Sequence, residues 1–195
     1  MTNIMISFAL VLIGTLAQAQ QLQLGNPAYG GTGCPSGTAS AVLSPDNQSL
    51  SIIFDAYQVA ASRVSGKSFD RKSCNLAIPV TIPQGYSLAI YSVDYRGFNH
   101  LPDGANSEFD VEYFFAGYRG PNFRHPFWGT LDDNYVISHE IPVAALVWSA
   151  CGARTTLRAN TSMRVSSYGD DALSTVDSAD VNAALIYHLE WKRCF

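Results

Sequence analysis

The fold class of this chain is clearest in residues 108–115, which read EFDVEYFF. Apolar or aromatic side chains occupy the odd positions: Phe109, Val111, Tyr113 and Phe115. Acidic side chains occupy three even positions: Glu108, Asp110 and Glu112. Because successive side chains of a β-strand point to opposite faces, this period of two predicts a strand with one buried and one solvated face.

The same alternation recurs along the chain, between turns rich in glycine, proline and asparagine. It predicts further strands at 50–56, 76–82, 86–96, 155–165 and 185–191, with a less regular one at 135–147. Residues 38–56 read as a hairpin around Pro45-Asp46-Asn47. We expect an all-β fold, an antiparallel β-sandwich or jelly-roll-like domain of about eight strands.

Between these strands the sequence predicts little helix and three long loops. Only residues 56–62 and 177–184 could form a helical turn or two. Glycine, proline and small polar residues predict loops at 97–106, 117–134 and 166–180.

Composition limits the class of protein. Hydrophobic residues make up 47% of the 195 residues and charged residues 14%, which is enough apolar material for one folded domain. The net charge is −4 and no basic cluster exists, so neither nucleic acid nor an anionic membrane is an expected partner.

The N-terminus predicts export. An apolar run at 4–16 is followed by Ala17-Gln18-Ala19, with small residues where a signal peptidase cleaves. We expect a signal peptide at residues 1–19 and a single secreted domain at 20–195. No second long apolar run follows, so we expect no transmembrane segment after cleavage and a secreted or extracellular protein.

Four cysteines agree with an oxidising compartment: Cys34, Cys74, Cys151 and Cys194. None forms a Cys-x-x-Cys pair, which argues against zinc ribbons and thioredoxin-like chemistry. Of three pairings, Cys34–Cys74 with Cys151–Cys194 is the simplest, since each bridge ties neighbouring elements. Asn47 and Asn160 begin N-glycosylation triplets, which matter only in an organism that glycosylates.

Seven short motifs follow one another through the chain: GCPSGT (33–38), IFD (53–55), RKSC (71–74), PQGY (83–86), VDYRG (93–97), VWSACG (147–152) and LEWKRC (189–194). In this order they resemble DUF4360, a secreted domain-of-unknown-function family of filamentous fungi and some bacteria. The resemblance implies a small secreted β protein with two disulfides. It supplies no catalytic residues.

Catalytic and metal-binding motifs are absent from the sequence. Neither Gly-x-Ser-x-Gly nor His-Glu-x-x-His occurs, and His139-Glu140 would point to opposite strand faces. The carboxylates of 108–112 have a spacing that permits glycosidase chemistry without indicating it. The aspartates at 170–180 fit no calcium loop. We therefore expect no cofactor and no metal site, and leave paired-carboxylate polysaccharide hydrolysis as the alternative function.

Aromatic and basic residues gather in two segments, 95–100 and 118–128. They suit binding of a glycan, a cell-envelope component or a protein, because aromatic rings stack on ligands and arginine donates to oxygen. The predicted binding residues are Tyr95, Arg96, His100, Tyr118, Arg119, Arg124, His125 and Trp128. The alternative is that these aromatics fold back as a small core. A non-catalytic extracellular binding protein is the leading hypothesis.

Overall fold

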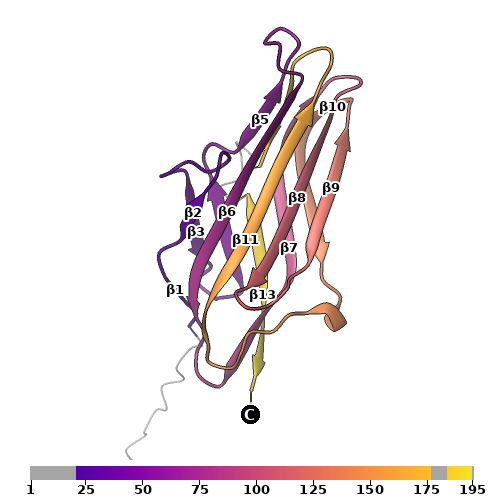
Figure 1. Ribbon diagram of the computed structural model, residues 1–195. Coiled ribbons are helices and arrows are strands. Elements are labelled where there is room, and N and C mark those ends of the chain that lie inside the picture. Colours follow the sequence, from indigo (N-terminus) through magenta and orange to yellow (C-terminus); the bar gives the residue numbers. More distant parts are fainter. Residues whose placement is uncertain (1–20, 177–183, 195) are drawn as a thin grey trace, which may run out of the picture.

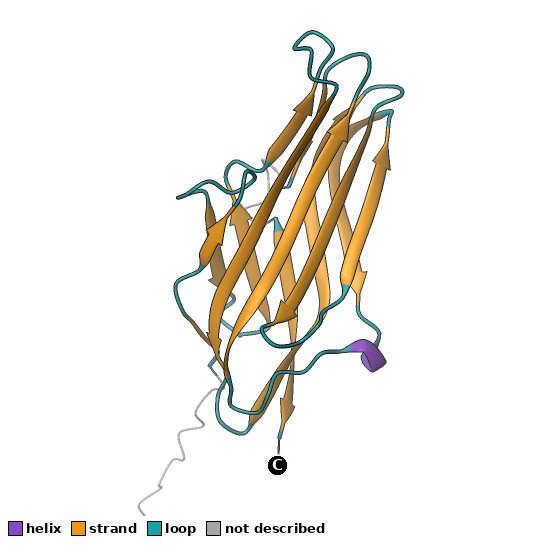
Figure 2. Cartoon of the chain, viewed as in Figure 1, coloured by secondary structure: helices purple, strands orange, loops and turns teal. Residues whose placement is uncertain are grey.

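A computed structural model describes residues 21–176 and 184–194. In these ranges the regular secondary structure is all strand apart from one short 3-10 turn, η1 (Val143–Ala145) (Figure 2). The strands are β1 (Gln23–Leu24), β2 (Ala28–Gly30), β3 (Ala39–Leu43), β4 (Ser49–Phe54), β5 (Gln58–Ala61), β6 (Phe69–Thr81), β7 (Tyr86–Leu101), β8 (Asn106–Phe115), β9 (Asn122–Trp128), β10 (Leu131–Glu140), β11 (Arg154–Ser166), β12 (Ala172–Thr175) and β13 (Leu185–Arg193).

These strands form two sheets packed face to face (Figure 1). The first has the order β1-β6-β11-β8-β9, with β2 also on β6. The second has the order β3-β4-β13-β7-β12-β5, with β10 also on β7. The described ladders between named strands are antiparallel, so the predicted antiparallel sandwich is confirmed.

Alternation determines which residues fill the space between the sheets. Along β8 every second residue from Ser107 to Phe115 is buried, as the acidic and apolar pattern predicts. The predicted hairpin is confirmed, because β3 and β4 pair from Ala39 with Phe54 to Leu43 with Leu50. The largest side chains in the core are Tyr95, Tyr113, Tyr187, Phe54 and Phe109.

Both predicted disulfides are present. Cys34 is bonded to Cys74 with a Cα–Cα distance of 5.4 Å, and Cys151 is bonded to Cys194 with 6.1 Å. The first bridge is fully buried in the core, whereas the second joins exposed Cys151 to half-buried Cys194 near the end of β13. Each bridge therefore ties segments about forty residues apart, at a different depth in the molecule.

Several sequence expectations were wrong. The described residues contain thirteen strands rather than about eight. Residues 56–62 hold strand β5 rather than a helical turn, and the loop expected at 166–180 contains β12. The loops expected at 97–106 and 117–134 are largely strands, because β7 extends to Leu101 and β9 and β10 occupy 122–140.

Two sequence expectations lie outside the described residues. They are the signal peptide at 1–19 and most of the turn at 177–184. In the described part of the chain no helix has the length and apolar character needed to cross a bilayer.

Candidate functional site

The aromatic segment 118–128 is not one loop, because most of it forms β9 and divides its side chains between two faces. Phe123, His125 and Phe127 point inward, and Arg124 and Trp128 point outward. β9 and β10 are neighbours in the chain, but each is hydrogen-bonded only to its own sheet. The inward rings fill the space between these two strands.

We call this ring stack the aromatic seam: Tyr95, Phe123, His125, Phe127, Tyr135 and His139. Tyr95 stacks on Phe123 with ring centroids 4.9 Å apart, and Phe123 lies 4.6 Å from His139. Phe127 is 4.8 Å from His125 and 4.7 Å from Tyr135. The alternative prediction, that these aromatics fold back as a small core, is therefore confirmed for the inward-pointing residues of segment 118–128.

The seam corrects one predicted binding residue, Tyr95, and includes a second, His125. Tyr95 is completely buried, so it cannot contact a ligand on the surface. His125 is half-buried between the rings of Phe123 and Phe127. Burial lowers the pKa of His125, and it also lowers the pKa of His139, whose Nδ1 is 3.2 Å from the hydroxyl of Tyr113. His139 is thus a partly buried residue that packs on the inner face of β10.

The outward half of β9 belongs to a broad polar surface. We call this surface the arginine face; it consists of the outward side chains of β6, β11, β8 and β9, which run side by side in Figure 1. Strand register places these side chains in lateral rows. One row contains Phe69, Ser166, Asn106 and Trp128; the next contains Arg71, Arg164, Glu108 and Pro126; a third contains Ser73, Ser162, Asp110 and Arg124.

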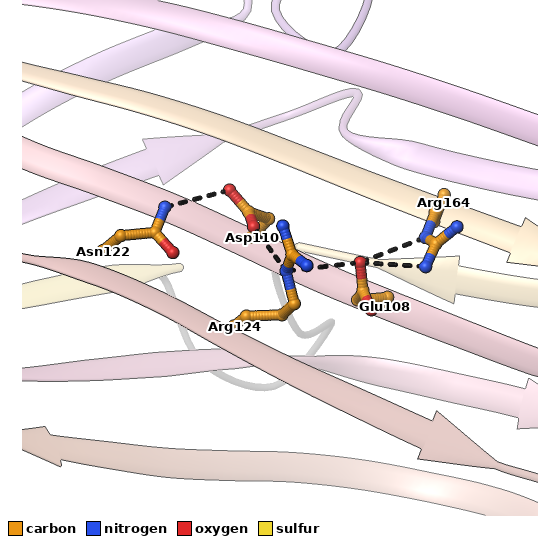
Figure 3. A network of polar contacts seen from close by, with 5 residues as sticks. All are labelled: Glu108, Asp110, Asn122, Arg124 and Arg164. Carbon is orange, nitrogen blue, oxygen red and sulfur yellow. Dashed lines mark hydrogen bonds and ion pairs between the residues drawn. The ribbon is translucent and has the colours of Figure 1, made fainter.

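Charged side chains are paired across the middle of this face (Figure 3). The Nε of Arg124 donates to Asp110 Oδ2 at 2.9 Å and lies 3.6 Å from Glu108 Oε1. Arg164 reaches the same Glu108 oxygen at 3.0 Å from the other side. Asn122 donates to the second oxygen of Asp110 at 3.3 Å. Glu108 thus bridges two guanidinium groups, which fixes the outward geometry of three strands.

A shallow, open depression lies over this network. Its lining residues are Phe69, Arg71, Glu108, Asp110, Arg124, Ser162 and Arg164. Two large exposed rings stand at the ends of the first lateral row: Phe69, 48% exposed, lines the depression, and Trp128, 67% exposed, is at the opposite end. Neighbouring strands lie about 4.8 Å apart, so the three steps from β6 to β9 separate these backbones by roughly 14 Å.

The remaining predicted binding residues lie elsewhere. Tyr118 and Arg119 are exposed in the turn between β8 and β9. Arg96 is half-buried and His100 exposed on β7, which belongs to the other sheet, where His100 Nδ1 lies 3.0 Å from Asp132. Of the eight predicted residues, only Arg124 and Trp128 are on the arginine face. The segment 95–100 and the segment 118–128 therefore do not form one surface.

The outer side of the second sheet carries a different depression. Its lining residues are Tyr91, Glu140, Ile141, Val143, Leu146, Trp148 and Glu190. Lys192 Nζ lies 5.5 Å from the ring centre of Trp148, a cation–π contact. We call this surface the glutamate face. It combines aromatic rings with two carboxylates and differs in charge from the arginine face.

A serine, an aspartate and a histidine lie together on the second sheet without forming a nucleophilic triad. Ser138 Oγ donates to Asp94 at 2.5 Å, and His188 Nε2 lies 2.9 Å from the other Asp94 oxygen. Burial raises the pKa of Asp94, but these two hydrogen bonds, together with the charges of His188 and Arg96, outweigh burial and leave that pKa below its ordinary value. Since the serine bonds to the carboxylate rather than to the imidazole, it is not activated as a nucleophile.

Metal-ligating side chains do not gather in the described part of the chain: no group of three or more His, Cys, Asp or Glu is positioned to hold an ion there. The aspartates at 170–171 line an open depression with Arg63 and His100 instead. Asp177 and Asp180 lie outside the described residues.

Sequence reasoning missed Phe69, Arg71 and Arg164. Phe69 and Arg71 stand at the start of β6, outside every predicted strand, and Arg164 stands inside the strand predicted at 155–165. The available signal was alternation: both arginines occupy the outward positions of β6 and β11. Their adjacency depends on the register of two strands about ninety residues apart, which alternation does not give.

A family model for a domain of unknown function, DUF4360, matches residues 20–194. This chain belongs to the DUF4360 family. A relative of this DUF4360 protein from Arthroderma benhamiae, described as an uncharacterized secreted protein, is 33% identical over 184 residues. The alignment covers 93% of this chain and 75% of the relative. The two disulfides and this secreted relative identify the DUF4360 protein as secreted.

Two solved structures share some likeness with the DUF4360 protein. TmCBM61 in complex with β-1,4-galactotriose is 11% identical, covers 86% of this chain and 88% of its own, and gives a TM-score of 0.26. A family 11 carbohydrate-binding module from Clostridium thermocellum with a mixed-linked tetrasaccharide is 8% identical, covers 91% of both chains, and gives 0.21. At these scores neither likeness carries an argument about what this chain binds.

Proposed function

We propose that this protein is a non-catalytic, secreted glycan-binding protein whose ligand lies across the arginine face. One observation carries the proposal. The rings of Phe69 and Trp128, 48% and 67% exposed, stand at the two ends of one lateral row, and Phe69 lines a depression that also contains polar groups of the next two rows. Large exposed rings beside oriented donors and acceptors are typical of a binding surface rather than of a solvated sheet.

The arrangement fits a chain of sugar rings. An aromatic ring stacks against the apolar face of a pyranose, while guanidinium, hydroxyl and amide groups donate to or accept from its hydroxyls. The two rings lie far enough apart for a short oligosaccharide rather than a single sugar. The ion pairs of Glu108, Asp110, Arg124 and Arg164 hold the donors in place before a ligand arrives, which reduces the entropy lost on binding.

A glycan array followed by isothermal titration calorimetry with the best ligand tests the proposal. We expect Trp128→Ala and Phe69→Ala each to weaken binding about tenfold or more, as truncation of aromatic hot spots does. The matched control is Tyr91→Ala, which removes a ring that is 43% exposed on the glutamate face.

Two results would contradict the proposal. Binding that is lost in Tyr91→Ala and kept in Trp128→Ala would place the ligand on the glutamate face. New reducing ends released from a bound polysaccharide would favour the hydrolase instead. The array should therefore be accompanied by a reducing-end assay on the same protein.

A further inference from the structure

Two arginines face each other across the pair of β6 and β11. Strand register places Arg71 directly opposite Arg164, and both side chains are on the arginine face. Like charges directly opposite each other in an antiparallel pair are destabilising. Arg164 is compensated by Glu108, with N–O distances of 3.0 and 3.1 Å. Arg71 makes no ion pair with any of the described residues.

The charges that line the depression do not balance. Three guanidinium groups, those of Arg71, Arg124 and Arg164, meet two carboxylates, those of Glu108 and Asp110. The depression therefore has one net positive charge, on a chain whose formal net charge is −4. Because Glu108 and Asp110 are engaged by the other two arginines, the positive charge left over is that of Arg71.

We propose that the ligand of the arginine face is a carboxylated glycan, a polysaccharide that contains uronic acid, and that Arg71 binds its carboxylate. This inference rests on the proposed function and names the ligand class. The planar guanidinium fork of arginine matches a carboxylate with two parallel hydrogen bonds, which a neutral sugar cannot offer. Phe69 lies next but one to Arg71 on the same strand face, so a sugar ring stacked there brings its carboxylate near the fork.

Neighbouring groups favour one carboxylate at this position rather than a highly charged polyanion. Ser162 lines the depression beside Arg164 and offers a hydroxyl to the same sugar. Glu108 and Asp110, both two strands away from Arg71, repel further anions. The site therefore suits a glycan whose carboxylates are spaced along a chain, with neutral hydroxyl-rich surface between them.

The test compares acidic oligosaccharides with neutral counterparts of the same backbone. Oligogalacturonate and oligoalginate are titrated into the protein by calorimetry, each beside its methyl-esterified or carboxyl-reduced form. We expect the acidic form to bind at least about tenfold more tightly, the scale of one charge-assisted hydrogen-bonded pair. Arg71→Gln should remove this preference, so that the variant binds the acidic and the neutral form with about equal affinity. Arg193→Gln, which removes an exposed charge on β13, should keep the preference.

Each outcome separates this inference from the proposed function. Equal affinity for acidic and neutral forms, or binding only to neutral glycans on the array, overturns the carboxylate inference and leaves glycan binding intact. A preference for the acidic form that persists in Arg71→Gln overturns the role of Arg71. Binding to none of these oligosaccharides and to no glycan on the array overturns both. An unchanged melting temperature for Arg71→Gln shows that the variant is folded.

Discussion

At the scale of single residues, Phe127 and Trp128 show how one strand serves both packing and recognition. They are adjacent in β9, yet Phe127 is 7% exposed and Trp128 is 67% exposed. Phe127 packs against His125 and Tyr135 in the aromatic seam, whereas Trp128 points outward on the arginine face. Alternation alone separates the two roles, since neighbouring side chains of a strand point to opposite faces.

The two residues should therefore respond differently to truncation. We expect Phe127→Ala to lower the free energy of unfolding by about 3–5 kcal/mol, as removal of a buried ring does. Trp128→Ala should change it by less than about 0.5 kcal/mol while weakening ligand binding. Denaturant unfolding of both variants measures the difference. A loss of several kcal/mol in Trp128→Ala would make that ring part of the structure rather than of the binding surface.

The two histidines of the seam make stability depend on pH. Burial lowers the pKa of His125 and of His139 below 6.5, so the folded protein resists protonation where the unfolded chain accepts it. The unfolded state then binds more protons as the pH falls through about 6.5. We expect the free energy of unfolding to decrease from there until the pH passes below the folded pKa values.

Thermal unfolding at about pH 7.5 and about pH 5.5 checks this dependence. The melting temperature should be lower at the acidic pH. A double variant, His125→Phe with His139→Phe, should lose much of that difference because the seam keeps its rings and no longer titrates. A melting temperature that rises on acidification would show that the seam does not control stability in this range.

At the scale of elements, sequence reasoning succeeded where alternation was regular and failed where glycine and proline interrupted it. The sequence predicted a loop beginning at Gly97, but this glycine lies inside β7. Because glycine has no side chain, the ring of Tyr135 and the carbonyl of Thr175 can lie close to its backbone. A Cβ at Gly97 would lie 2.1 Å from that carbonyl oxygen. Pro126 read as a loop residue too, although β9 is the last strand of its sheet, where a proline is tolerated.

The binding surface was harder to predict than the strands for a related reason. Trp128 and Arg124 could be found because they stand out in composition. Phe69 and Arg71 could not, because their neighbours on the arginine face come from β8, β9 and β11. Local pattern gives each strand its two faces, but which strands lie side by side depends on long-range pairing.

The two disulfides should differ in how easily they open. The bonded cysteines are 40 and 43 residues apart, so the two closed loops have similar lengths. The chain-entropy model therefore assigns each disulfide about 4 kcal/mol of stabilisation. Reduction needs a thiolate to reach a sulfur atom, and only the Cys151–Cys194 bond is at the surface, since Cys34 and Cys74 are fully buried. We expect a mild reductant to open Cys151–Cys194 first.

Alkylation during partial reduction, followed by peptide mapping, measures this order. Early labelling should fall on Cys151 and Cys194 while the protein remains folded. Labels on Cys34 and Cys74 should appear only as the core unfolds. Simultaneous labelling of all four cysteines in folded protein would contradict the order that burial predicts.

At the scale of the whole molecule, the sandwich presents two outer surfaces of opposite character. The depression on the arginine face has three arginines and two carboxylates in its lining. The depression on the glutamate face has Glu140 and Glu190, with Lys192 over Trp148 nearby. Since the two sheets are packed face to face, these surfaces point away from each other (Figure 1). A ligand of one charge should therefore select one surface.

This selection gives a prediction for the complete protein. On titration with an acidic oligosaccharide, backbone chemical shifts should change mainly in β6, β8, β9 and β11. The chemical shifts of residues in β7, β10 and β13 should stay nearly unchanged. Electrostatic repulsion by Glu140 and Glu190 opposes an anion on the other sheet. Because the attraction to Arg71 is partly exposed to solvent, raising the salt concentration should weaken binding without moving the affected residues. Shifts that gather instead around Tyr91 and Glu140 would place the recognition surface on the opposite sheet and would contradict the selection of a surface by the charge of the ligand.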